Sequence, residues 1–175
     1  MNLPAGWRFS GPFRSNAGFR EALAAGRDEA ASRNHRMIRP AHILAGILRS
    51  PDARVVAALA DLGILVSDLT AAIATEVGPS LSSNTRGPDL AYMRRGAAVL
   101  HGAVRAAERL RHDWLGAVHL LAALSQESWG AAPRVLHTAG VSPSRLWPAI
   151  ERIAARMPPP PSSDPPLRLP VQDLE

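Results

Sequence analysis

Four histidines are the residues of this sequence whose type and spacing first suggest chemistry. His35 and His42 are seven residues apart, and His112 and His119 repeat that spacing. Imidazole nitrogens bind zinc, act as general bases or form internal hydrogen bonds. Zinc sites usually add a carboxylate or thiolate, and a catalytic triad needs Ser and Asp in fixed relation to His. Neither pattern recurs beside both pairs, so we predict that these histidines are structural, hydrogen bonding a loop to a helix, with no metal and no cofactor.

Both histidine pairs lie in a segment that occurs twice. Residues 35–45 return as residues 112–122, shifted by 77 residues. The same offset relates further pairs without a gap: Leu23/Leu100, Ala30/Ala107, Leu59/Leu136, Gly63/Gly140, Ser67/Ser144, Leu69/Leu146 and Ile73/Ile150. An internal period of this length indicates one folding unit that was copied and fused. The chain is a tandem duplication.

Helical periodicity accounts for the elements that position the histidines. Ser15 or Asn16 suits the cap of a first helix, and Pro40 suits the first turn of a second. Ser67 can cap a fourth helix, whereas Pro148 should distort the eighth or displace its start. No stretch shows the sustained alternation of a strand. The prediction is an all-α protein of two tandem four-helix repeats, eight helices in total, with pseudo-two-fold symmetry.

Changes in composition divide the chain into five regions. They are an irregular N-terminal arm (1–15), repeat 1 (16–77), a polar linker (78–88), repeat 2 (89–157) and a Pro-rich disordered tail (158–175). No apolar run approaches the ~20 residues of a membrane span, and the N-terminus lacks the apolar core of a signal peptide. The sequence has no Cys, which suits a cytoplasmic protein without disulfides. We expect no contact with a membrane.

Arginine supplies the whole positive charge. The net charge is +5 and the chain contains no Lys, which excludes Lys nucleophiles and a phosphate-binding loop of the G-x-x-x-x-G-K-[ST] type. An Arg-rich surface is open to nucleic acid or to an acidic protein, although acidic residues are interspersed along the chain. The arginines considered for such a face are Arg8, Arg14, Arg94, Arg95, Arg105, Arg109 and Arg111.

The repeated motif resembles the N-terminal domain of the Clp-type AAA+ unfoldases, which carries two Clp repeats. The family motif runs approximately E-A-x-x-x-x-H-x-x-[IV]-G-T-E-H-[IL]-L, followed by a helix that ends in L-x-x-x-G-[IV]. The first copy matches at Glu29-Ala30, His35, Ile38, His42-Ile43-Leu44, Leu59 and Gly63-Ile64. The second matches at Ala107, His112, Leu115-Gly116, His119-Leu120-Leu121, Leu136 and Gly140-Val141.

The resemblance implies a non-enzymatic binding module without the ATPase modules of the family. Its expected partners are Clp unfoldase or protease components, adaptors, substrate proteins or cyclic-peptide ligands, which it would bind or titrate. The implied contact surface is a groove between the repeats near Phe13, Tyr92 and Arg95. Tyr92 matches the family aromatic that contacts cyclic peptides, and Arg95 matches a family Arg. The alternative is an Arg-rich all-α regulator that associates with nucleic acid, which we consider the less favoured reading.

Two departures from the family motif concern phosphorylated arginine. The Glu that precedes the second His in the family is replaced by Ala41 and Val118. In some members that carboxylate contacts the guanidinium of phosphoarginine, and a carboxylate pairs with a guanidinium through two charge-assisted hydrogen bonds. Neither Ala nor Val forms them. We therefore predict weak or no phosphoarginine binding.

Overall fold

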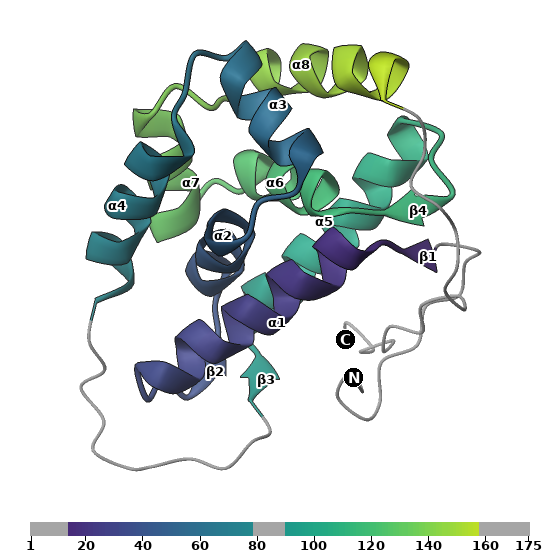
Figure 1. The fold of residues 1–175 in the computed structure, drawn as a ribbon. Coiled ribbons are helices and arrows are strands. Elements are labelled where there is room, and N and C mark those ends of the chain that lie inside the picture. Colours follow the sequence, from purple (N-terminus) through teal and green to yellow (C-terminus); the bar gives the residue numbers. More distant parts are fainter. Residues whose placement is uncertain (1–13, 79–89, 158–175) are drawn as a thin grey trace.

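Eight helices and four two-residue strands make up the part of the chain that the computed structural model describes, residues 14–78 and 90–157 (Figure 1). The first half contains β1 (Arg14–Ser15), α1 (Ala17–Ser32), β2 (Met37–Ile38), α2 (Pro40–Arg49), α3 (Ala53–Asp61) and α4 (Val66–Val77). The second half contains β3 (Ala91–Tyr92), α5 (Arg94–Arg109), β4 (Trp114–Leu115), α6 (Ala117–Gln126), α7 (Ala131–Thr138) and α8 (Pro143–Arg156). Our predictions for the arm, the linker and the tail concern residues that lie almost entirely outside these two ranges.

Each element of the first half has its counterpart about 77 residues later. Helices α1 and α5 begin at residues 17 and 94, and α4 and α8 begin at residues 66 and 143. The strands keep the same offset, because β1 and β3 begin at residues 14 and 91. The predicted duplication of a four-helix repeat is confirmed.

The strands join the two repeats, which the sequence analysis did not anticipate. β1 pairs with β4 and β2 pairs with β3, both in parallel. We call residues 14–18 with 113–116 the β1–β4 seam, and residues 36–39 with 90–95 the β2–β3 seam. The two seams lie at opposite ends of α1 (Figure 1). Strands of two residues are too short to produce a visible alternation in the sequence.

Helices α2 and α6 lie at the centre of the molecule, and the remaining helices surround them (Figure 1). Nearly all of their side chains are buried, because both are apolar on every face rather than along one stripe. The two repeats share one hydrophobic core. At the surface, Arg152 of α8 pairs with Asp61 of α3 at 2.9 Å, and Arg134 of α7 pairs with Glu76 of α4. The duplicated halves therefore form one packed unit.

Helices α1 and α2 cross at two glycines. A Cβ added at Gly46 would lie 2.1 Å from the carbonyl oxygen of Ala22 and 2.5 Å from the backbone nitrogen of Gly26. A Cβ added at Gly26 would lie 2.7 Å from the carbonyl oxygen of His42. Only glycine permits two backbones to approach this closely. This contact sets the position of α2, and therefore of His42, relative to α1.

One helix start differs from the prediction, and the expected displacement of another does not occur. Asn16 caps α1 by accepting the Phe19 N–H at 2.8 Å, but Ser67 does not cap α4, which already begins at Val66. Pro148 lies within α8, and the helix still runs from Pro143 to Arg156. Pro148 has no N–H to donate to the Ser144 carbonyl. Both residues are exposed, so water can hydrogen bond to that carbonyl.

Membrane-span criteria select no single helix within the two described ranges. Only the pair α3 and α4, bent by 99° at their junction, meets them by length and composition.

Candidate functional site

Each histidine pair joins the loop after a long helix to the start of a central one. His35 Nδ1 lies 2.7 Å from His42 Nε2, and the backbone N–H of Arg39 donates to His42 Nδ1 at 2.9 Å. The second repeat reproduces the chain of bonds, at 2.9 Å between His112 and His119. Because Nδ1 of His42 accepts, its Nε2 carries the proton and donates to His35. The arrangement supports the proposal that the four histidines are structural.

Burial favours the neutral form of three of these imidazoles. It lowers the pKa of His42 to about 4, with a further contribution from the neighbouring His35. Burial likewise lowers the pKa of His119 to about 3 and lowers the pKa of His112. Across residues 14–78 and 90–157, no three His, Asp or Glu side chains gather where they could share a metal ion. The pairs are suited to hydrogen bonding rather than to proton transfer at neutral pH.

Two of the three residues proposed for a groove between the repeats lie within the described ranges. Tyr92 and Arg95 both belong to the β2–β3 seam, but Tyr92 is only 8% exposed and its burial raises its pKa to about 12. Arg95 is exposed in the first turn of α5. Phe13 lies outside the described residues, and the chain next to it, β1, belongs to the other seam. The two seams lie at opposite ends of α1 (Figure 1).

Exposed methionines and arginines mark the β2–β3 seam. Met37 and Met93 are 40% and 38% exposed, and the backbone N–H of Met93 donates to the Ile38 carbonyl at 2.8 Å. The surrounding arginines are exposed as well: Arg36, Arg39, Arg94 and Arg95. Sequence reasoning overlooked Met37, Met93, Arg36 and Arg39. The available signal was two short Arg-Met segments, R-M-I-R directly before α2 and M-R-R at the start of α5.

An aromatic cluster closes the equivalent place at the β1–β4 seam. Trp114 is 6% exposed and stacks on His112, with ring centroids 4.7 Å apart. Its ring also meets His119 edge-on at 4.8 Å. The Arg54 guanidinium lies 4.9 Å from the Trp114 ring centroid, in cation–π contact. This seam is occupied by the protein's own side chains.

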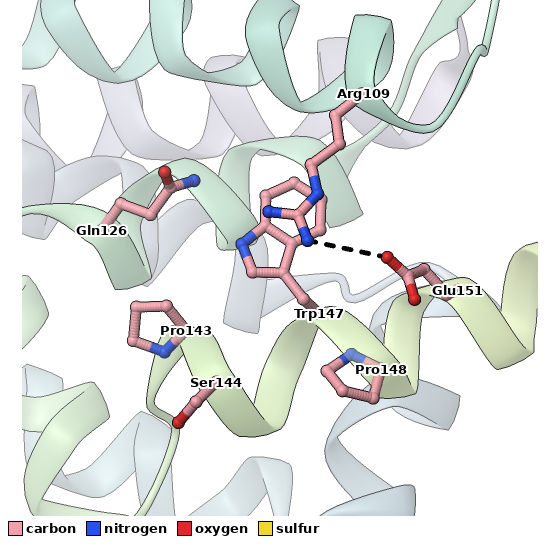
Figure 2. Close-up of a pocket in the computed structure, with 7 residues that line it drawn as sticks. All are labelled: Arg109, Gln126, Pro143, Ser144, Trp147, Pro148 and Glu151. Carbon is pink, nitrogen blue, oxygen red and sulfur yellow. Dashed lines mark ion pairs between the residues drawn. The ribbon is translucent and has the colours of Figure 1, made fainter.

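A second surface feature is a shallow cleft of about 410 Å³ between α5, α6 and α8 (Figure 2). The Arg109 guanidinium lies over the Trp147 ring, 4.0 Å from its centroid, and 3.7 Å from a Glu151 carboxylate oxygen. Trp147 is buried and Trp129, elsewhere, is 73% exposed. Arg109 covers the indole and is paired with an acid. The cleft therefore offers a ligand fewer uncovered apolar or charged groups than the β2–β3 seam does.

Comparison with protein families places both halves in one group. The model of the Clp repeat (R) N-terminal domain matches residues 14–108 and 91–174. The chaperone protein ClpB of Oceanobacillus iheyensis is 30% identical over 122 residues. The negative regulator of genetic competence ClpC/MecB of Bacillus subtilis is 29% identical over 126 residues. Each match covers 70% of this chain and 15% of the relative, so the chain spans only a small part of these relatives' length.

Solved structures with the same fold are N-terminal domains of related unfoldases. The Hsp104 N-terminal domain from Candida albicans superposes with a TM-score of 0.68 at 15% identity, covering 82% of this chain and 91% of that one. The N-domain of ClpV from Vibrio cholerae gives a TM-score of 0.64 at 17% identity, covering 90% and 98%. A complex of a ClpV N-domain with a VipB peptide gives 0.63 at 19% identity, covering 90% and 99%.

Proposed function

The chain belongs to the Clp repeat N-terminal domain family, and from this premise we propose that it is a non-enzymatic module that binds proteins or peptides. The observation that carries the proposal is the two-repeat architecture, because an N-domain of the same architecture has been solved with a peptide of a partner protein, VipB. The four histidines support this reading, since their nitrogens are engaged in holding loops to helices. The fold thus provides a rigid platform, and recognition falls to its surface residues.

The proposed setting is regulated proteolysis by the Clp system. The curated relatives include ClpB and ClpC proteins, in which the matching segment is about 15% of the chain. A domain similar to theirs would bind or titrate adaptors, substrates or cyclic-peptide ligands of an unfoldase. Its partners would be Clp unfoldase or protease components and the proteins these recruit.

The β2–β3 seam is the proposed contact surface. It includes Arg95, and it exposes apolar side chains beside cationic ones. Tyr92 belongs to the seam but is only 8% exposed. Ala41 and Val118 replace the family Glu, and both are buried apolar residues in the first turns of α2 and α6. This supports the prediction of weak or no phosphoarginine binding.

The nucleic-acid alternative is less well supported by the arginines. Four arginines in the described ranges form ion pairs with acids, and one of them, Arg109, is among the arginines considered for a basic face. The ion pairs are Arg33–Glu29, Arg109–Glu151, Arg134–Glu76 and Arg152–Asp61. Neutralised arginines contribute little to the phosphate contacts on which nucleic-acid affinity depends.

The test is direct binding of Clp ligands to the full chain. Labelled cyclic-peptide ligands, adaptor proteins and phosphoarginine peptides would be titrated by fluorescence anisotropy against wild type, Arg95→Ala and the control Arg49→Ala. We expect binding of at least one adaptor or peptide, weakened by Arg95→Ala and unchanged by Arg49→Ala, with no phosphoarginine binding. Failure of every Clp component to bind, in titration and in affinity capture, would reject the proposal.

A further inference from the structure

We propose that the β2–β3 seam recognises an acidic peptide segment that also carries an apolar side chain. This inference rests on the proposed function and names the chemistry of its ligand. The seam consists of two short segments, Arg36 to Arg39 and Leu90 to Arg95. The β2–β3 pairing holds them side by side. Its surface combines two kinds of group that a ligand can complement, positive charge and flexible apolar side chains.

The positive charge of the seam has no paired acid in the part of the chain that the structure describes. Arg36, Arg39, Arg94 and Arg95 are exposed, and within the described ranges none of them forms a salt bridge. Neither strand segment of the seam contains an acidic residue. The two segments total ten residues and carry four guanidinium groups. Guanidinium groups bind carboxylates through paired, charge-assisted hydrogen bonds.

The apolar component comes from Met37 and Met93. Both side chains are among the few large hydrophobic ones exposed on this molecule in the described ranges. They lie on adjoining backbone segments, since Met93 follows β3 and its N–H binds the carbonyl of Ile38, next to Met37. Methionine is unbranched and polarizable, and it adapts to different apolar partners at binding surfaces. The pair therefore suits an aliphatic or aromatic side chain set among the acids of a peptide.

The chain contains its own comparison, because the β1–β4 seam has the same backbone arrangement with different residues. There Trp114 fills the place of Met37 and is buried against two histidines. An acid, Asp113, stands where the β2–β3 seam has Arg36. The equivalent pairs that include a charged residue or a methionine are Arg36/Asp113, Met37/Trp114, Arg39/Gly116, Ala91/Arg14, Met93/Asn16, Arg94/Ala17 and Arg95/Gly18. The β1–β4 seam thus has no exposed methionine and one exposed arginine, Arg14, against four exposed arginines and two exposed methionines at the β2–β3 seam. The fold forms without this concentration of cationic and apolar side chains, so its presence at one seam calls for a reason other than folding.

The arginines also oppose the local helix preferences. Arg94 and Arg95 occupy the first turn of α5, where the helix dipole disfavours positive charge. Met93 occupies the N-cap of α5 without a capping side-chain bond, whereas its counterpart Asn16 caps α1. Residues that break local rules without a compensating contact are expected at functional sites. This second observation is independent of the exposure of the seam.

The experiment compares three fluorescent peptides that share their apolar residues and differ only in charge. One carries Asp and Glu, one carries Asn and Gln, and one carries Arg at the same positions. Anisotropy with the full chain should show the acidic peptide bound at least tenfold more tightly than the neutral one at low salt, with the difference shrinking as salt increases. The basic peptide should bind least.

Variants locate the contact. Arg94→Gln with Arg95→Gln should weaken acidic-peptide binding by about tenfold, and Arg36→Gln with Arg39→Gln should do the same. Met37→Ser should weaken the acidic and the neutral peptide alike. The control Arg49→Gln with Arg156→Gln removes the same charge from exposed positions away from the seam and should leave binding unchanged. The Arg94/Arg95 double variant should unfold at a temperature no lower than that of wild type. The reason is that two positive charges are removed from the N-terminus of α5, where the helix dipole disfavours them.

Three results would overturn the inference. Neutral or basic peptides that bind as tightly as the acidic one would contradict it while leaving the proposed function intact. If the Arg49/Arg156 control loses as much acidic-peptide affinity as the seam variants, the effect comes from net charge and not from the seam. A labelled single-stranded oligonucleotide that binds more tightly than the acidic peptide, and is lost in the same variants, would assign the seam to nucleic acid. If none of the peptides and no Clp component binds wild type, the proposed function fails as well.

Discussion

One position in the repeat shows how far a single residue can change a surface. Met37 and Trp114 occupy the same place in their copies, one residue before the buried apolar position at Ile38 and Leu115. The indole of Trp114 is large enough to stack on His112 and close its seam, whereas the thioether of Met37 is left partly in solvent. Aromatic stacking together with burial makes Trp114 a stabilising residue.

Replacing Trp114 by Ala should therefore destabilise the protein strongly. We expect a loss of about 3–5 kcal/mol in the free energy of unfolding, because the change leaves a cavity beside His112 and His119. Met37→Ala, at the equivalent exposed position, should change it by less than about 0.5 kcal/mol. Urea unfolding followed by circular dichroism measures both. Similar losses in the two variants would contradict the asymmetry between the seams.

The buried histidines predict a loss of stability in mild acid. The folded-state pKa values of His42 and His119, about 4 and about 3, lie below the unfolded value of 6.5. Between these values the unfolded chain binds protons that the folded protein does not. Stability is therefore fully present above pH 6.5 and falls as the pH decreases toward 4.

The measurement is urea unfolding across that pH range. We expect the free energy of unfolding to fall by on the order of a few kcal/mol in total between pH 7 and pH 4. His42→Gln should have a flatter profile, although it starts from lower stability, and the exposed control His101→Gln should keep the wild-type slope. A wild-type profile that is flat across this range would contradict a neutral, buried pair.

At the scale of the elements, the crossing of α1 and α2 is determined by glycine. Gly46→Ala would place a methyl group against the backbone of Ala22 and Gly26, and overpacking of this kind costs about 1–3 kcal/mol, or more where backbone must shift. Thr70→Ala, on the exposed face of α4, should cost less than about 0.5 kcal/mol. Chemical denaturation distinguishes the two. If Gly46→Ala left the free energy of unfolding unchanged, α1 and α2 could move apart without loss of stability, and the close crossing would not be required.

At the scale of the whole molecule, the repeats should unfold together. Their strands pair only across the repeats, and their helices share one core. A repeat that cannot bury its apolar face alone depends on its neighbour. We expect one thermal transition, with equal calorimetric and van't Hoff enthalpies. Two resolved transitions in differential scanning calorimetry would contradict this, and a variant at the α1–α2 crossing should shift the single transition as a whole.

The sequence by itself determined the duplication, the helices and most of their boundaries. A period of 77 residues, the helical spacing of apolar residues and capping by Asn16 are local or repeated features, and these can be read from one chain. The expected cap at Ser67 and the expected displacement of the α8 start by Pro148 were wrong. Both depend on how the helices pack, which a local pattern does not show.

Only the tertiary structure decided which surface is available for recognition. The strand pairs that form the seams join residues 54 and 100 positions apart, and two-residue strands carry no periodic signal. Their pairing buries Tyr92, separates it from the chain beside Phe13 and brings Arg36 to Arg39 next to Met93, Arg94 and Arg95. Identical backbone arrangements then receive different side chains at the two ends of α1. The sequence supplied those side chains, and the packing of one copy against the other decided which of them solvent, and therefore a partner, can reach.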